Sequence, residues 1–282
     1  MATPAILAEA RAQKQIAILG CGKMGGILLQ AFLDGNLVAA TAIAATVQHP
    51  EKARARSAGS AAAVVPGCDN RAAVAGAPVV LLCLKPQTLP QVLAEIAGAL
   101  APGALVISIA ASATLDFIQR KLGAGVPVLR AMPNTPASVG AAMTALCLGA
   151  AVRAEHVAIA QRLFESIGRV AIVDEKDMDA ITALSASGPA FAFVILEALA
   201  EAGVKVGLPR ELATTLAAQT LFGSAKLALD TGHHPALLKD AVTTPAGCTV
   251  EGLMELERGG LRMTLMNAVV RTRERARELM AG

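Results

Sequence analysis

The first half of the chain alternates short apolar runs with amphipathic segments. Five runs consist almost entirely of aliphatic and small residues, the pattern of strands buried on both faces of a sheet: residues 15–20, 41–47, 78–85, 104–110 and 126–132. Between them lie segments bounded by Pro or polar starts and Gly ends, which predict helices: residues 23–34, 50–58, 88–99 and 114–122. This repetition predicts an α/β fold with a doubly wound, mainly parallel sheet covered by helices on both faces. Residues 142–148, 154–167 and 169–173 add a strand, a helix and a strand.

After Asp174 the strand pattern stops and only helical segments follow. We predict helices over residues 175–184, 189–205, 209–230, 235–242, 247–257 and 260–280. The change of pattern predicts three parts: a frayed extension (1–14), an α/β domain (15–174) and an all-α domain (175–282). Alanine-rich helices with few aromatic residues make a thin core, so we expect their apolar faces to meet a second copy of the chain.

Composition excludes several classes of protein. The net charge is only +3 and the basic residues are scattered, so no nucleic-acid surface is predicted. The mean hydropathy of +0.55 suggests a membrane, but the longest uncharged run, between Arg130 and Arg153, contains two prolines that would leave backbone groups unpaired in lipid. The first fourteen residues lack the apolar segment of a secretion signal. Five solitary cysteines, with no CxxC pair, fit a reduced cytoplasmic protein without disulfides or a metal site.

A glycine motif follows the first predicted strand directly. Gly20, Gly22 and Gly25 form G-x-G-x-x-G where a strand turns into a helix. In a dinucleotide site the first glycine allows the tight turn, the second lets backbone approach a pyrophosphate, and the third lets the helix pack closely. The helix amino terminus then offers free N–H groups to the phosphates. A glycine-rich turn without a ligand is the alternative; the strand–turn–helix context favours dinucleotide binding.

The residues after the second strand bear on which dinucleotide binds. An NAD site usually has an acidic residue here for the ribose 2′-hydroxyl. Thr46, Gln48 and His49 are neutral and the first acid is Glu51, followed by the basic residues Lys52, Arg54 and Arg56. We therefore expect NADP rather than NAD, although these basic residues also fit a solvated helix face. Lys85, which ends the strand at 78–85, fits a cofactor contact and an ordinary edge lysine equally well.

Several segments together resemble one family. They are "GCGKMG", "KPQ", "MPNTP", "SASGPA", "EAGVKVGLPRELA", "AAQTLFGSAKLAL" and "VTTPAGCTVEGL", in this order from residue 15 to about 280. In order and spacing they are similar to those of pyrroline-5-carboxylate reductase. The resemblance implies an amino-terminal Rossmann domain and a helical domain that interlocks with its twin. It further implies reduction of 1-pyrroline-5-carboxylate to L-proline with NADPH, or sometimes NADH, in homodimers that often form decamers.

The resemblance also assigns roles to residues of this chain. The predicted cofactor residues lie around the glycine motif and at the ends of strands: Leu19, Gly20, Cys21, Gly22, Lys23, Met24, Gly25, Thr46, His49, Asn70, Cys83, Leu84, Lys85, Pro86, Ala110 and Ala111. The predicted substrate residues are Thr243, Thr244, Gly247, Cys248 and Thr249. Thr249 is the residue whose hydroxyl is expected to reach the imine nitrogen, and hence the predicted catalytic residue.

The stretch 242–253 has chemistry that suits a small carboxylate. Pro245 stiffens it, Gly247 lets its backbone come close, and amides at the start of a helix bind anions. The alternative is a simple helix cap by Thr244 or Thr249. Four positions depart from the family pattern: Ala186 and Ala246 stand where glycine is usual, Phe191 where tyrosine is usual, and Thr244 where serine is usual. These differences bear on substrate geometry more than on the type of reaction.

Two other functions compete with this interpretation. A related reductase could act on another cyclic imine or on a 3-hydroxy acid, but hydroxy-acid dehydrogenases normally need a lysine early on the first long helix of the second domain. Here the only lysine of that helix is Lys205, near its end. A non-catalytic NADP sensor on the same fold would bind cofactor and reduce no imine.

Overall fold

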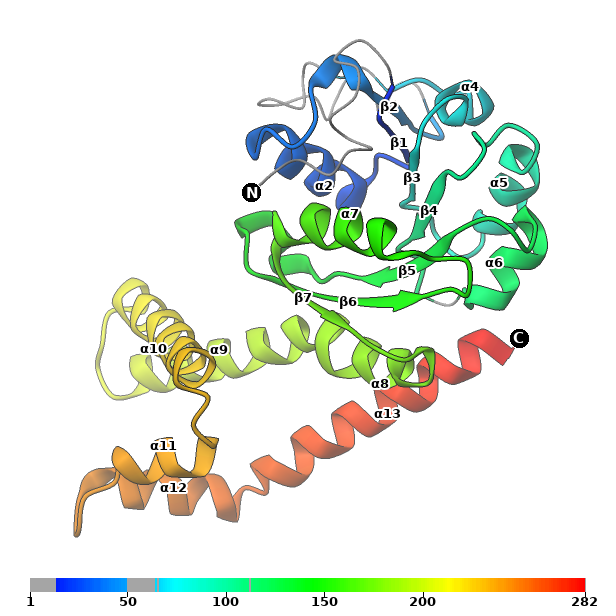
Figure 1. The fold of residues 1–282 in the computed structure, drawn as a ribbon. Helices are drawn as coiled ribbons and strands as arrows, with labels where there is room; N and C mark the ends of the chain where they lie inside the picture. Colours follow the sequence, from blue (N-terminus) through cyan, green and yellow to red (C-terminus); the bar gives the residue numbers. More distant parts are fainter. Residues whose placement is uncertain (1–13, 50–63, 65, 112, 282) are drawn as a thin grey trace. The chain divides into compact units, whose positions relative to one another are not determined.

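The computed structural model describes residues 14–49, 64, 66–111 and 113–281. The predicted helix at 50–58 and almost all of the predicted extension at 1–14 lie outside these residues. The chain forms two compact units: Met1–Ala186 with Arg275–Gly282, and Ser187–Glu274. Figure 1 traces the elements along the chain.

The first unit is built on a seven-stranded sheet with the strand order β2-β1-β3-β4-β5-β6-β7. The strands are β1 (Ile16–Leu19), β2 (Ile43–Thr46), β3 (Val79–Leu82), β4 (Leu105–Ser108), β5 (Val128–Met132), β6 (Ala142–Leu148) and β7 (Gly168–Ile172). All neighbouring pairs are parallel except β5 and β6. The predicted doubly wound, mainly parallel sheet is confirmed. The antiparallel pair arises because residues 133–141, which hold only the short 3-10 helix η3 (Thr135–Val139), are too few for a parallel crossover.

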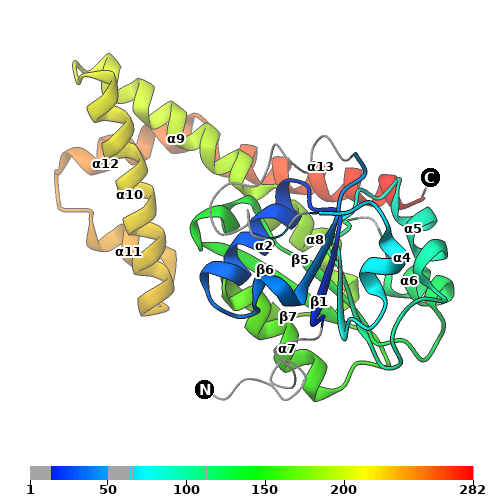
Figure 2. The same cartoon turned by 90° about the horizontal axis from the view of Figure 1, so that it is seen from above.

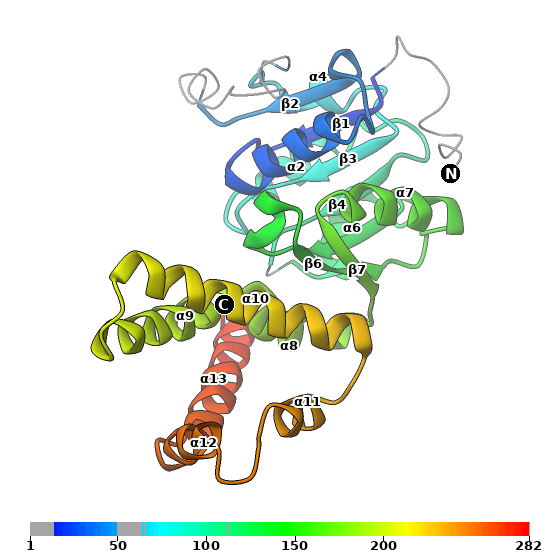
Figure 3. The same cartoon turned by 90° about the vertical axis from the view of Figure 1, so that its left-hand side faces the viewer.

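Helices cover both faces of this sheet, as Figures 2 and 3 show. On one face pack α2 (Lys23–Asp34) and α7 (Ala154–Glu165), through side chains such as Phe32 and Phe164. On the other lie α4 (Asn70–Val74), α5 (Leu89–Ile96) and α6 (Leu115–Leu122). Successive residues of β1 point to opposite faces, so both faces need a helical layer. The sequence pattern missed α4, since five residues are too few to show a helical period.

The predicted helix at 175–184 is three shorter pieces. A 3-10 turn η4 (Glu175–Asp177) leads into α8 (Met178–Ile181), and then into the π-helical turn η5 (Thr182–Ala186). Met178 and Ala183 bury their side chains in the first unit. These pieces therefore belong with the sheet, although the sequence pattern changes before them.

The second unit is helical. It contains α9 (Gly188–Lys205), α10 (Arg210–Thr231), α11 (Pro235–Ala241), α12 (Cys248–Arg258) and most of α13 (Leu261–Ala281). α9 and α10 form a closely packed hairpin: a Cβ on Gly203 would stand 2.8 Å from the Cβ of Ala213. The buried apolar residues of this unit, within the described part of the chain, are three alanines: Ala200, Ala213 and Ala217.

Large apolar side chains on these helices are exposed instead. Phe193, Val194 and Phe222 are each at least 60% exposed. Within the described residues, the stretch Glu175–Lys205 is the one helical run long and apolar enough, by length and composition, to cross a membrane, and only 11% of its most apolar window is buried. A partner that covers these helices is therefore needed to remove their apolar surface from water.

Candidate functional site

Most of the predicted cofactor residues gather at one edge of the sheet. Strands β1, β2, β3 and β4 run parallel, and the residues that follow their carboxyl ends are Gly20, Val47, Cys83 and Ile109. The chain passes from β1 to β2 on one side and returns to β3 on the other, so the strand order reverses beside β1. In open α/β sheets the ligand crevice lies outside such a reversal.

The glycine turn has the geometry that its sequence predicts. Gly20 has a φ of +89°, and a Cβ there would stand 2.6 Å from the carbonyl oxygen of Cys83. A Cβ on Gly25 would stand 2.5 Å from the carbonyl oxygen of Gly20, so α2 packs directly on the turn. Side chains at either position would force the turn apart.

The amino terminus of α2 is open to an anion. Its N-cap is Gly22, which makes no side-chain cap, and the first turn carries no acidic residue. The amides of Lys23, Met24 and Gly25 have no acceptor inside the helix, as in any first turn. Backbone donors and the positive end of the helix dipole therefore face the turn, which suits a pyrophosphate.

Side chains from three elements meet beyond β2. Thr46, the last residue of β2, is buried and its hydroxyl donates to Oδ1 of Asn70 at 2.8 Å. Nδ2 of Asn70 donates to Oε2 of Glu95 on α5 at 2.9 Å. Sequence reasoning placed Thr46 and Asn70 in the site but missed Glu95, because no local motif links α5 to the end of β2. His49 is exposed, and Glu51, Lys52, Arg54 and Arg56 lie outside the described residues.

The segment after β3 forms a tight turn beside the glycine loop. The Cys83 amide donates to Leu19 at 2.8 Å, and the Lys85 carbonyl accepts from Thr88 and Leu89. Burial, and secondarily the nearby Cys21, raises the pKa of the Cys83 thiol far above its ordinary value. The Cys83 side chain is half-buried, and its raised pKa favours the neutral thiol over the thiolate.

The connection after β4 is held by a side chain that the sequence analysis did not select. The Ala110 amide donates to the hydroxyl of Ser108 at 3.3 Å. The carbonyl of Ala111 accepts from Nη2 of Arg130 at 3.1 Å, and Nη1 of Arg130 pairs with Glu175 at 2.6 Å. The sequence did contain an indication of this contact: Arg130 stands in the middle of an otherwise apolar strand, and a buried arginine needs a specific partner.

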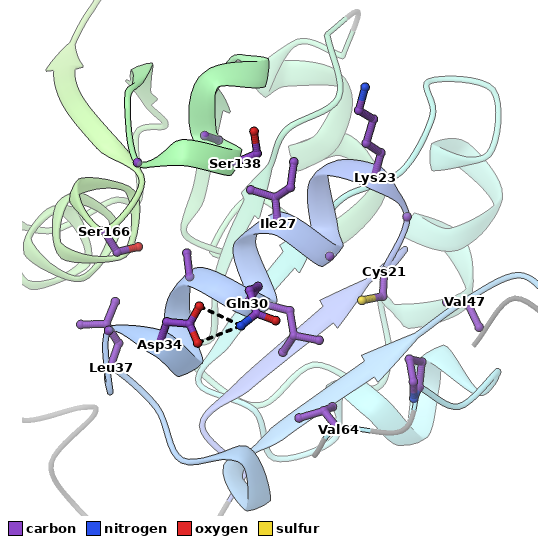
Figure 4. Close-up of a pocket in the computed structure, with 18 of the residues that line it drawn as sticks. Cys21, Lys23, Ile27, Gln30, Asp34, Leu37, Val47, Val64, Ser138 and Ser166 are labelled. Atoms are coloured by element: carbon purple, nitrogen blue, oxygen red, sulfur yellow. Dashed lines mark hydrogen bonds between the residues drawn. The ribbon is translucent and has the colours of Figure 1, made fainter. Parts of the chain in front are cut away.

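A pocket of about 880 Å³ begins at the glycine turn (Figure 4). Of the predicted cofactor residues, Cys21, Gly22 and Lys23 line it. From there it follows α2 towards Ser138 and Ser166, past the hydrogen-bonded pair Gln30 and Asp34. The pocket does not include the residues after β3 and β4. It therefore fits the pyrophosphate turn but not the rest of the predicted cofactor site.

The predicted substrate residues all lie in the second unit, around a turn before α12. The Gly247 amide donates to the Thr244 carbonyl at 3.0 Å, which closes a β-turn over Pro245 and Ala246. Ala246 has a φ of +57°, the left-handed conformation that glycine prefers at this turn position. A Cβ on Gly247 would overlap the Thr244 hydroxyl, so any other residue there would have to displace that side chain.

The donors that this turn offers differ partly from the prediction. The Thr243 hydroxyl donates to the Lys239 carbonyl at 2.9 Å, so its hydrogen is already used. The Gly247 amide is likewise engaged, whereas the amides of Cys248 and Thr249 begin α12 and have no acceptor inside the helix. The N-cap is Gly247, with no side-chain cap. In the described part of the chain no helix amide donates to the hydroxyl of Thr244 or Thr249, which speaks against the alternative of a simple helix cap.

Thr249 itself is half-buried. No other group in the described part of the chain hydrogen-bonds to its hydroxyl. Cys248, beside it, is a free exposed cysteine. Among the described residues there is no group of three or more His, Cys, Asp or Glu side chains that could hold a metal ion.

Comparisons with known proteins match a family model to each of the two parts of the chain. Residues 175–279 match the family model for pyrroline-5-carboxylate reductase dimerisation, and residues 15–112 match that for NADP oxidoreductase, coenzyme F420-dependent. Pyrroline-5-carboxylate reductase of Methanosarcina acetivorans is 40% identical over 94% of this chain and 98% of its own length. That of Arabidopsis thaliana is 46% identical over 71% of this chain and 72% of its own.

Solved structures give the same result over the whole chain. A pyrroline-5-carboxylate reductase from Coxiella burnetii has a TM-score of 0.86 and 34% identity, covering 94% of this chain and 98% of its own. The Plasmodium falciparum pyrroline carboxylate reductase, solved with NADP bound, has a TM-score of 0.85 and 27% identity, covering 95% and 98%. The protein therefore belongs to the pyrroline-5-carboxylate reductase family.

Proposed function

We propose that this protein reduces 1-pyrroline-5-carboxylate to L-proline with NADPH, the last step of proline biosynthesis. One observation carries the proposal: a single chain of this family combines an open glycine turn at the carboxyl edge of its sheet with a donor-bearing turn at residues 243–249. The first suits a dinucleotide pyrophosphate and the second suits a small carboxylate.

The residues around the sheet edge fit the cofactor. Gly20 and Gly25 leave room that a Cβ would fill, and the start of α2 presents amides without a competing acid. We assign Thr46 and Asn70 to the adenosine part of NADPH. Cys83–Pro86, Ala110 and Ala111 are assigned to the rest of the cofactor. When bound, NADPH supplies the hydride. NADH is a second cofactor that the same backbone contacts would accept.

The turn before α12 is assigned to the substrate. The amides of Cys248 and Thr249 bind the carboxylate, and Thr244 adds its hydroxyl. The Thr249 hydroxyl, to which no described group of the chain hydrogen-bonds, reaches the ring nitrogen and stabilises it as it gains its proton. The reaction adds one hydride to carbon and leaves the nitrogen protonated. A protonated imine is already electrophilic, so no strong general acid is needed.

The assembly completes the proposal. The second unit, which lies within the residues 175–279 that match the dimerisation model, serves as the substrate and dimerisation domain, and the exposed apolar faces of α9 and α10 pack against a second copy. We expect a homodimer at least, with a decamer as its larger form, in the cytoplasm. Light scattering on the purified protein measures the assembly.

The decisive experiment mixes protein, NADPH and 1-pyrroline-5-carboxylate and follows the loss of NADPH absorbance, with L-proline identified by mass spectrometry. Matched reactions with other cyclic imines and with 3-hydroxy acids plus NADP test the competing substrates. Proline formation with the highest kcat/KM for 1-pyrroline-5-carboxylate is the expected result. NADPH binding without turnover of any imine would leave the cofactor-sensor function instead.

A further inference from the structure

Three side chains form a hydrogen-bonded chain that ends in a carboxylate. Thr46 donates to Oδ1 of Asn70 at 2.8 Å, and Nδ2 of Asn70 donates to Oε2 of Glu95 at 2.9 Å. They come from the end of β2, the start of α4 and the body of α5. Both ends of the Asn70 amide are thus engaged, and one N–H of Nδ2 remains for a further partner.

The position of this chain matters because of what binds beside β2. In this fold the ribose of the adenosine lies beyond the end of the second strand, where a carboxylate binds a 2′-hydroxyl and a cation accommodates a 2′-phosphate. The segment directly after β2 has no acid before Glu51. The fold instead brings a carboxylate towards this corner from α5, behind the Asn70 amide.

No cation neutralises the Glu95 carboxylate within the described part of the chain. Arg71 is the basic residue that contacts Glu95, and its Nη1 donates to the backbone carbonyl at 3.4 Å, not to the carboxylate. Glu95 is only partly exposed, so water screens its charge less than that of a fully solvated side chain. The carboxylate of Glu95 therefore places a negative charge directly behind the Asn70 amide.

We propose that Glu95 is a positioning residue that sets cofactor specificity: it orients the Asn70 amide, and its charge opposes the 2′-phosphate of NADPH more than the 2′-hydroxyl of NADH. The inference rests on the proposed function, in which Asn70 lies beside the adenosine ribose. It predicts that the chain prefers NADPH less strongly than it would without the charge of Glu95.

The substitution Glu95→Gln tests the charge alone, because glutamine keeps a carbonyl oxygen that accepts from Asn70. Dissociation constants for NADPH and NADH are measured by direct binding to the wild type and the variant. At low salt the ratio of the NADH to the NADPH constant should rise about 3- to 10-fold, the size that one nearby surface charge gives. Raising the salt should shrink the difference. An unchanged ratio overturns the inference.

Asp116→Asn is the matched control. It removes the same charge from an exposed residue of α6 in the same unit, which pairs with Arg120. The ratio should stay at the wild-type value, and an equal shift in this control would also overturn the inference. Glu95→Ala removes the acceptor as well, so both cofactors should bind more weakly while the ratio still moves towards NADPH.

Binding is measured without turnover, so the two proposals fail separately. If the wild type forms proline but the Glu95→Gln variant has the same ratio of NADH to NADPH dissociation constants, the specificity inference alone is contradicted. Wild-type protein that binds NADPH but reduces no imine contradicts the proposed function, and the binding ratio still decides the role of Glu95.

Discussion

The guanidinium of Arg130 lies 2.6 Å from the carboxylate of Glu175 and is buried in the middle of β5, with a side chain only 2% exposed. The same carboxylate oxygen accepts from the Leu115 amide at 2.7 Å, and Nη2 of Arg130 donates to the Ala111 carbonyl. One ion pair therefore holds the residues on either side of the β4–α6 connection. Ala111 belongs to the predicted cofactor site, so this pair supports its position.

Breaking this pair should destabilise the fold far more than breaking a surface pair. Arg130→Met leaves Glu175 without its cation, and we expect a loss of about 2–4 kcal/mol in the free energy of unfolding, measured in urea. Arg120→Met, which breaks an exposed pair with Asp116, should change it by less than about 0.5 kcal/mol. Equal losses in the two variants would show that burial of Arg130 contributes nothing.

The two adjacent glycines of α2 give a matched test of the cofactor turn. A Cβ at Gly25 would stand 2.5 Å from the Gly20 carbonyl, whereas nothing lies within 4 Å of one at Gly26. Gly25→Ala should therefore lower NADPH affinity at least about 10-fold, since it pushes α2 off the turn. Gly26→Ala should keep affinity and stabilise the helix by about 0.5–1 kcal/mol. Calorimetric titration measures the first effect and urea unfolding the second.

Ala246 is a non-glycine residue in left-handed conformation, at φ +57°. Removing the Cβ of Ala246 relieves the steric strain of this conformation. We expect this gain to exceed the entropic cost of glycine's greater freedom in the unfolded chain, so Ala246→Gly should stabilise the protein by about 0.5–1 kcal/mol. Ala94→Gly, at an exposed position inside α5, should do the reverse and destabilise by about 1 kcal/mol. A loss of stability in Ala246→Gly would mean that the left-handed conformation is not strained.

Removing the Thr249 hydroxyl should lower the rate of catalysis without changing cofactor binding. Thr249→Val keeps the shape of the side chain and removes the group assigned to the imine nitrogen, so kcat should fall on the order of 10²-fold. The dissociation constant for NADPH should not change, because the predicted cofactor residues lie in the other unit. Thr215→Val, which removes a hydroxyl that only bonds back to Glu211 within α10, should keep full activity. Full activity in Thr249→Val would assign the hydroxyl no catalytic role.

The alternation of apolar runs with helical segments was enough to predict all seven strands, the helix at 23–34 and, two residues too long, the helix at 154–167. Each is long or strongly patterned, so local sequence decides it. The pieces that escaped prediction depend on tertiary contacts. The π-helical turn at 182–186 breaks a helical period that the sequence continues, and α4 is a single short turn. Glu95 lies 25 residues along the chain from Asn70, and Arg130 lies 19 residues from Ala111. Contacts over such separations leave no local motif in the sequence.

His156 adds a dependence of stability on pH. It is buried on α7, and its Nδ1 accepts from the Arg153 amide at 3.1 Å. Its Nε2 has no hydrogen-bond partner within the described residues and lies 3.8 Å from the Glu155 carboxylate. Burial, and then the charge of Arg153, lowers the pKa of this imidazole below its ordinary 6.5, while Glu155 acts weakly in the opposite direction. The folded state therefore takes up the proton less readily than the unfolded chain. Protonation would also break the bond from the Arg153 amide.

The sign of the effect follows from this difference. Above about pH 6.5 both states hold a neutral imidazole and His156 contributes no pH dependence; below it the unfolded chain binds the proton first, so the free energy of unfolding falls. The slope of the free energy of unfolding against pH from this one group should approach about 1.4 kcal/mol per pH unit until the folded pKa is reached.

His156→Asn keeps an acceptor for the Arg153 amide. The variant should flatten the dependence of the free energy of unfolding on pH between about pH 7.5 and 5.5, even if its stability is lower throughout. Urea unfolding at a series of pH values measures the wild type and the variant, and an unaltered slope in His156→Asn would assign the acid sensitivity to other groups.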